Sequence, residues 1–195
     1  MMPNLILASG SPRRKDLLSE ACYDFQVIVP DVEENEDVSV PIRQLTKENA
    51  ELKAEAVSSA NTDAVVIAAD TLVLLGERVL TKPIDGDEAT EMLASLNGKS
   101  HQVFTAFSIL HSTEGRRVLE TVTTDVHFKL LTEAEMAEYH KRINPMDKAG
   151  AYAAQEHGKL IIDRIEGSMT NVIGLPMKKV AEILESEFGI VPTLK

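Results

Sequence analysis

Residues 64–69 read Ala-Val-Val-Ile-Ala-Ala, a continuous apolar run rich in β-branched side chains. Such a run predicts a strand that is buried on both faces of a sheet. It leads directly into Asp70-Thr71-Leu72-Val73-Leu74-Leu75, and Gly76-Glu77 then turns the chain back through Val79-Leu80. We therefore expect a central buried strand that ends at Asp70, followed by a hairpin.

Strands and helices alternate on both sides of this central strand. The spacing of apolar residues predicts further strands over 5–8, 26–29, 101–110, 122–130 and 160–165, and helices over 12–22, 41–59, 85–98 and 132–142 and from residue 176. Ser11 and Pro12 are expected at the N-cap and the first position of the first helix. The predicted inward face of the 41–59 helix consists of Ile42, Leu45, Asn49, Leu52 and Ala56. The pattern is that of an α/β (α+β mixed) chain, with helices flanking a mixed sheet.

Composition excludes several classes of protein. The chain has 195 residues, with 20 Lys and Arg against 31 Asp and Glu, and a formal net charge of −11. This balance argues against a duplex nucleic-acid binder, which normally carries a basic face. A single cysteine, Cys22, rules out an intrachain disulfide, and we expect it in the core on the inward face of the first helix. The apolar run at 5–8 is too short for a signal peptide, and no run is long enough for a membrane span, so we expect a cytoplasmic protein without a membrane partner.

The first candidate site is Ser9-Gly10-Ser11-Pro12-Arg13-Arg14. The first turn of a helix has free backbone N–H groups and the positive end of the helix dipole, so two arginines there are unfavourable unless an anion lies nearby. A phosphate group bound by Arg13 and Arg14 would explain the pattern. The alternative is a pair of surface arginines after an ordinary cap.

Further candidates lie along the chain. Asp70 is expected at the carboxyl end of the buried strand, where ligands bind in open α/β sheets, and Thr71 adds a hydroxyl; the alternative is an aspartate that caps a turn. Lys53 is expected at the border of the apolar face of its helix, about 100° from Leu52, where lysines usually extend to solvent. Lys82, before Pro83, is a somewhat better candidate for a phosphate contact.

Gln155 follows a segment, 147–154, that is short of large side chains. Its amide has both donors and an acceptor and could recognise the edge of a base, although it could equally be a glutamine of a surface loop. The five histidines lack metal-ligand spacing, and His101 is expected to be a packing residue at the start of a strand.

Taken together, these stretches resemble the Maf family of nucleoside triphosphate pyrophosphatases. The matching pieces follow the order of the family: Ser9-Gly10-Ser11-Pro12-Arg13-Arg14, Glu33-Glu34, Lys53-Ala54, Ala68-Ala69-Asp70-Thr71, Lys82-Pro83, Gly98-Lys99-Ser100-His101, Asp147-Lys148-Ala149-Gly150-Ala151-Tyr152 and Asn171-Val172-Ile173-Gly174-Leu175-Pro176. The resemblance implies one domain over residues 1–195, with an elongated mixed sheet, flanking helices and two lobes around a cleft, similar to inosine triphosphate pyrophosphatases.

The resemblance also implies an activity. A nucleoside triphosphate and water would give the monophosphate and pyrophosphate, with Mg²⁺ or Mn²⁺ as cofactor. By position, Asp70 resembles the general base and Glu34 an acidic residue linked to the metal, so that these two would be the metal ligands, while Lys53 and Lys82 resemble catalytic phosphate contacts. The residues that would bind substrate are Ser9, Arg13, Arg14, Thr71 and Gln155. Arg13, Thr71 and Gln155 match the branch of the family that acts on dTTP and UTP, with modified pyrimidine nucleotides and a homodimer left open.

Two other functions stay open at this point. A non-catalytic nucleotide or nucleic-acid binding module in the control of septum formation would need only the cationic residues, whereas Asp70, Glu34 and Lys82 together favour an enzyme. A phosphomonoesterase with the same pocket would release orthophosphate rather than pyrophosphate.

Overall fold

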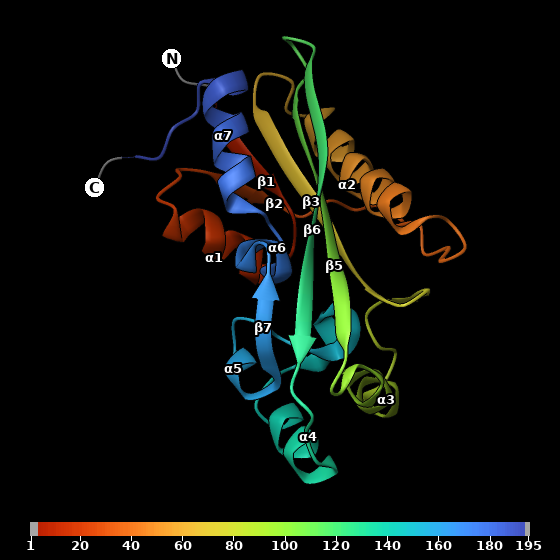
Figure 1. The fold of residues 1–195 in the computed structure, drawn as a ribbon. Helices are drawn as coiled ribbons and strands as arrows, with labels where there is room; N and C mark the ends of the chain where they lie inside the picture. The colour runs from red at the N-terminus through yellow and green to blue at the C-terminus, as the bar shows by residue number, and fades with distance from the viewer. Residues whose placement is uncertain (1–3, 194–195) are drawn as a thin grey trace. The chain divides into compact units, whose positions relative to one another are not determined.

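The structure, a computed structural model, describes residues 4–193 of the chain (Figure 1). The strands are β1 (Leu5–Ala8), β2 (Gln26–Ile28), β3 (Val65–Leu75), β4 (Arg78–Leu80), β5 (Ser100–His111), β6 (Arg116–Phe128) and β7 (Ile162–Glu166). The helices are α1 (Pro12–Glu20), α2 (Ile42–Ser58), α3 (Gly86–Leu96), α4 (Glu133–His140), α5 (Gly158–Ile161), α6 (Met169–Ile173) and α7 (Met177–Phe188), with 3₁₀ turns η1 (Pro145–Asp147) and η2 (Ala149–Ala151).

The described strands form one seven-stranded mixed sheet in the order β2-β1-β3-β5-β6-β7, with β4 paired to β3. β1 pairs in parallel with β2 and with β3, with Leu5 opposite Val65 and Leu7 opposite Ile67. β4 is antiparallel to β3, and β7 is antiparallel to β6. The predicted α/β class is therefore confirmed.

The chain divides into two compact units, which we describe separately. Unit 1 comprises the described residues up to Asp70, Thr105–Val122 and the residues from Gly174 onward; unit 2 comprises Thr71–Phe104 and Thr123–Ile173. Strands β3, β5 and β6 contribute residues to both units. That the chain acts as a single domain stays a prediction.

In unit 1, α2 packs against one face of the sheet. Ala54 and Val57 of α2 contact a cluster that includes Ile6, Ala8 and Val66. Successive residues of a strand point to opposite faces, so Leu5, Leu7, Val65 and Ile67 point to the other face. Figure 1 shows α1 and α7 on that side. The central strands are thus covered on both faces, which explains their continuous apolar sequence.

In unit 2, α3 and the segments after β6 surround a second cluster. Met92, Leu93 and Leu96 of α3 are buried in it, as the periodicity of the helix predicts. His101 is 2% exposed and bonds to the hydroxyl of Tyr152 through Nε2, at 2.8 Å. The rings of His101, Phe128 and Tyr152 meet edge to face, so the prediction that His101 is a packing residue is confirmed.

Several local predictions are wrong. α1 ends at Glu20, and Cys22 lies beyond it with a φ of 60° and intermediate exposure, so it is not a core residue on the helix. Ser11 occupies the N-cap position but its side chain makes no capping hydrogen bond. Residues 158–161 form the short helix α5 rather than the start of a strand, which begins at Ile162.

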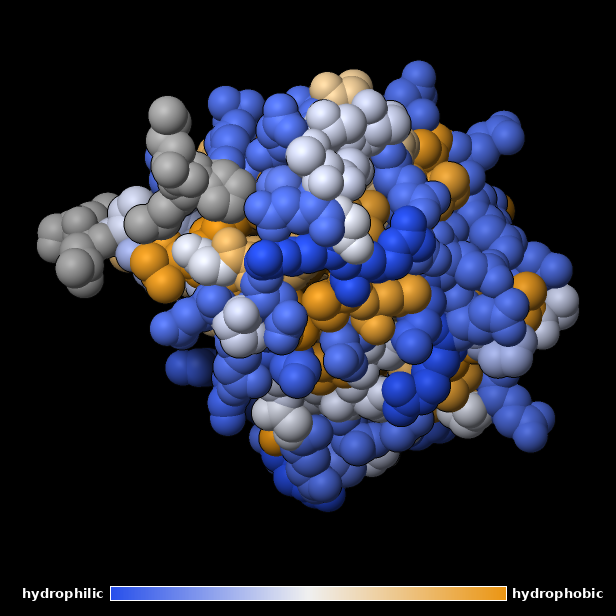
Figure 2. Space-filling view, turned by 90° about the horizontal axis from the view of Figure 1, so that it is seen from above, coloured by the Kyte–Doolittle hydropathy of each residue, from blue (hydrophilic) through white to orange (hydrophobic). Residues whose placement is uncertain are grey.

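The surface is mainly polar. The face drawn in Figure 2 is mostly hydrophilic, with hydrophobic residues exposed in small groups. Such small groups are normal on a folded protein. Among the described residues, no helix has the length and apolar character needed to cross a membrane.

Candidate active site

Asp70, Lys53 and Glu34 form a connected cluster in unit 1. The Nζ atom of Lys53 lies 2.6 Å from Oε2 of Glu34 and 2.9 Å from Oδ1 of Asp70. β3 supplies Asp70, α2 supplies Lys53, and the segment between β2 and α2 supplies Glu34. One ammonium therefore joins carboxylates from two separate parts of the chain.

The positions of Asp70 and Lys53 differ from the prediction. Asp70 lies inside the eleven-residue strand β3 rather than at its end, because the hydrophobic sequence after Thr71 continues the same strand. Lys53 is 7% exposed on the buried face of α2, whereas Leu52 is 37% exposed. Ile42, Leu45 and Asn49 are buried as predicted, but further along α2 Lys53 and Val57 are buried in place of Leu52 and Ala56. Lys53 is thus a buried ion-pair partner rather than a lysine at the border of the face.

Asp70 retains hydrogen-bonding capacity. The residue is 7% exposed, and its Oδ2 atom has no hydrogen-bond partner among residues 4–193. A buried polar atom without a partner is costly and in native proteins usually indicates a functional role or an additional bound group. The second oxygen of Asp70 is therefore available to accept a proton from water or to bind a cation.

The start of α1 provides the cationic part of the site. Oγ of Ser9 accepts hydrogen bonds from the backbone N–H of Ser11 at 3.1 Å and from Nη1 of Arg14 at 3.2 Å. Nε of Arg14 donates to the carbonyl oxygen of Gly174 at 2.8 Å. Ser9, which is 5% exposed, therefore orients the side chain of Arg14 and the backbone before α1.

Electrostatics connect this cationic part to the carboxylates. Burial lowers the pKa of Arg14 from its ordinary value, and the negative charge of Asp70 acts in the opposite direction. The positive charge of Arg13 lowers the pKa of Arg14 further, and Glu34 raises it. The positive charges of Arg13 and Arg14 repel each other, so a bound anion would stabilise the charged forms of both guanidinium groups.

The other predicted residues belong to unit 2. Thr71 follows Asp70 in β3 and is half-buried, and Lys82 is exposed just after β4. Gln155 is exposed and lines a cavity of about 630 Å³ together with residues of α5, β7 and α6. In unit 1 the structure thus shows two groups of residues in direct contact. Lys53 contacts Glu34 and Asp70, and Arg14 contacts Ser9.

Comparison with known proteins identifies the family. A sequence model of the Maf-like protein family matches residues 4–187. The dTTP/UTP pyrophosphatase of Desulforamulus reducens is 43% identical over 189 residues, which are 97% of this chain and 98% of that protein. The dTTP/UTP pyrophosphatase of Akkermansia muciniphila is 46% identical over 184 residues, which are 94% of this chain and 96% of that protein. The chain belongs to the Maf-like protein family.

The fold also has a relative of low sequence identity among solved structures. The Ham1 protein of Staphylococcus aureus is 16% identical, with a TM-score of 0.50, and the match covers 94% of this chain and 99% of that one. At this identity the likeness concerns the fold alone.

Proposed function

We propose that the protein hydrolyses dTTP and UTP to the nucleoside monophosphate and pyrophosphate, as the names of its relatives state for them. The observation that carries the proposal is the buried cluster of Asp70, Lys53 and Glu34, because a purely binding module has no need of a buried carboxylate with a free oxygen. The proposed substrates are cytoplasmic metabolites, so we place the activity in the cytoplasm.

In this proposal Asp70 acts on the attacking water. Its Oδ2 accepts a hydrogen bond and then the proton of a water whose oxygen attacks the α-phosphorus. The bond from that phosphorus to the bridging oxygen breaks, and pyrophosphate leaves with the bonding electrons. Lys53 orients Asp70, while Arg13 and Arg14 offset the negative charge of the phosphate chain.

We propose that Glu34 and Asp70 would hold a divalent cation, Mg²⁺ or Mn²⁺. Carboxylate oxygens are the ligands that these ions prefer, and the carboxylates of Glu34 and Asp70 contact the same ammonium group and therefore lie close together. When bound, such an ion would neutralise charge on the phosphoryl oxygens and lower the pKa of water. No group of three or more His, Cys, Asp or Glu side chains able to hold a metal is found in residues 4–193, so phosphate oxygens of the substrate would complete the ligand set.

For base selection we propose Gln155. Its amide matches the N3–H and a neighbouring carbonyl of thymine or uracil, whereas cytosine presents an unprotonated N3 and an amine. Its place at a cavity of about 630 Å³ supports this role, because ligand pockets of small molecules have about this size. A mismatch that the bound base covers costs about 1–3 kcal/mol per unpaired group, so we expect a 10- to 100-fold preference.

The test is a product-resolved assay of dTTP, UTP, dCTP and CTP with Mg²⁺ or Mn²⁺. We expect pyrophosphate and monophosphate, higher kcat/KM for dTTP and UTP, and loss of this preference in Gln155→Ala. Glu156→Ala is the matched control, since Glu156 is exposed beside Gln155 but is not part of the cavity wall. Release of orthophosphate alone, or no turnover of any triphosphate, would contradict the activity. Equal rates with CTP and UTP would contradict the role of Gln155.

A further inference from the structure

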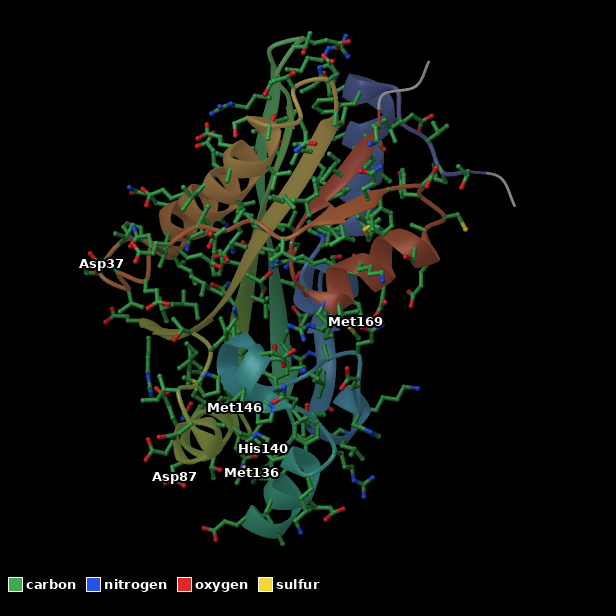
Figure 3. The ribbon with its side chains drawn as sticks, turned by 180° about the vertical axis from the view of Figure 1, so that it is seen from behind. Asp37, Asp87, Met136, His140, Met146 and Met169 are labelled. Carbon is green, nitrogen blue, oxygen red and sulfur yellow. The ribbon has the colours of Figure 1, made fainter. Side chains whose placement is uncertain are left out.

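The segment that carries Glu34 has no regular secondary structure. It connects β2, which ends at Ile28, to α2, which begins at Ile42. Figure 3 shows Asp37 at the outer end of this segment, away from the sheet. Most of its residues are exposed, and loops of this kind are usually more mobile than the elements they connect. Some contact must therefore determine where Glu34 lies relative to Asp70.

Asn49 makes that contact with the residue next to Glu34. Oδ1 of Asn49 accepts a hydrogen bond from the backbone N–H of Asn35 at 2.7 Å. Nδ2 of Asn49 donates to the backbone carbonyl of Asn35 at 2.9 Å. The side-chain amide thus pairs with both backbone groups of one residue, and only asparagine and glutamine carry a donor and an acceptor side by side in this way.

The environment of Asn49 strengthens this pairing. Asn49 is 4% exposed on the buried face of α2, so leaving its side-chain amide without a partner would be costly. The side chain of Asn35, by contrast, makes exposed hydrogen bonds. It donates to Oε2 of Glu48 at 3.1 Å and accepts from the backbone N–H of Asp37 at 2.9 Å. The buried attachment of the segment therefore runs through the backbone of Asn35 and not through its side chain.

Asn49 lies one helical turn before Lys53. Residues four apart share a face of a helix, and both side chains are buried. Lys53 binds the carboxylate of Glu34, and Asn49 binds the backbone next to it. One helix thus holds Glu34 by its carboxylate and the next residue, Asn35, by its main chain.

We propose that Asn49 is the positioning residue of Glu34, and that its amide sets the distance between the carboxylates of Glu34 and Asp70 for the proposed hydrolysis. The inference rests on the proposed function, in which both carboxylates take part. Substitution of Asn49 does not change the side chain of Glu34 itself. It removes the contact that positions the segment carrying Glu34. Loss of the Asn49 side chain should therefore lower turnover only to the extent that Glu34 contributes to turnover.

The experiment is a double-mutant cycle of Asn49→Ala and Glu34→Gln, with kcat and KM measured for dTTP. We expect Asn49→Ala to lower kcat/KM roughly 10-fold in the wild-type background, since two part-buried hydrogen bonds are lost. In the Glu34→Gln background the same change should cost less than about 2-fold, because the carboxylate that Asn49 aims is already absent. Asn35→Ala is the matched control, since it removes the exposed side-chain contacts and keeps both backbone groups, and its kcat/KM should stay within about 2-fold of the wild type.

Wild-type kcat/KM in Asn49→Ala, or an equal loss in both backgrounds, would overturn the proposal, because a purely structural role lowers turnover whether or not Glu34 is present. If Asn49→Ala does not fold, Asn49→Ser takes its place in the cycle. Hydrogen exchange at the backbone N–H of Asn35 gives a measurement independent of activity, and we expect it to accelerate at least 10-fold in Asn49→Ala but not in Glu34→Gln. If the wild type releases no pyrophosphate, the proposed function fails, and unchanged exchange at Asn35 would separately refute the contact.

Discussion

Replacing Lys53 with methionine tests the electrostatics of the candidate active site. The change removes the ammonium shared by Glu34 and Asp70 and keeps a side chain of similar length. The side chain of Glu34 is 37% exposed and can return to water, so its part of the cost is small. The side chain of Asp70 is 10% exposed and cannot. Breaking a buried pair from one side costs about 3–5 kcal/mol, and we expect the free energy of unfolding to fall by about 3 kcal/mol.

Urea unfolding followed by circular dichroism at pH 7 measures this change directly. For a chain of this size, a loss of about 1 kcal/mol in the free energy of unfolding lowers the Tm by about 2–4 °C. The Tm should therefore fall by roughly 6–12 °C. The double variant Lys53→Met/Asp70→Asn should recover most of the loss, because the uncompensated charge is then gone. Lys15→Met, at an exposed position of α1, serves as the control and should unfold like the wild type. A Lys53→Met variant within about 0.5 kcal/mol of the wild type would refute the argument that Asp70 depends on this ion pair.

Three further changes have distinct outcomes. Asp70→Asn is nearly isosteric but cannot take up a proton, so kcat should fall about 10²-fold or more with an unchanged circular dichroism spectrum, and a kcat near that of the wild type would remove Asp70 from the mechanism. Arg13→Ala should lower kcat/KM roughly 10- to 200-fold without changing the metal requirement, and unchanged kinetics with every substrate would exclude a phosphate contact. Burial lowers the pKa of His101 to about 4, below the value of about 6.5 in the unfolded chain. The stability that neutral His101 contributes is therefore complete above about pH 6.5 and is lost as the pH falls from 6.5 towards 4. His101→Gln should therefore lose about 3 kcal/mol less than the wild type over that range. Identical pH dependence of His101→Gln and wild type in urea unfolding would contradict this.

The larger elements could be predicted because their sequence patterns are strong and local. The face of α3 follows from its apolar spacing, and α4 begins near the predicted residue 132, where Thr132 and Glu135 form a capping box. The short helices α5 and α6, of four and five residues, contain too few turns to produce a periodic pattern. The end of α1 was missed because Ala21 and Cys22 continue the apolar spacing of the helix, whereas the backbone of Cys22 already has a positive φ.

The candidate site was predictable as a set of residues but not as a set of contacts. The sequence predicts Arg14 at the start of a helix, where it lies, and Asp70 at the end of a strand, whereas the structure places it inside β3. The burial of Lys53 could not be predicted in this way, because where a lysine and a leucine are neighbours on a helix, the leucine is normally the buried residue. Only the pairing of Lys53 with two carboxylates from distant parts of the chain makes its burial favourable. The role of Asn49 was missed for the same reason, since its partner is the backbone of a residue outside the helix.

The division of the chain has a consequence for its synthesis. Unit 1 is discontinuous, since residues up to Asp70 are completed by Thr105–Val122 and by the segment from Gly174 onward, and Arg14 bonds to Gly174 itself. Ribosomes add about 5–20 residues per second, and domains generally fold as units during synthesis. All the residues of unit 2 leave the ribosome before Gly174 does, whereas residues 4–70 can complete their native contacts only after that segment is made. We therefore expect nascent chains that stop before Gly174 to contain a protease-resistant unit 2 and a protease-sensitive N-terminal segment.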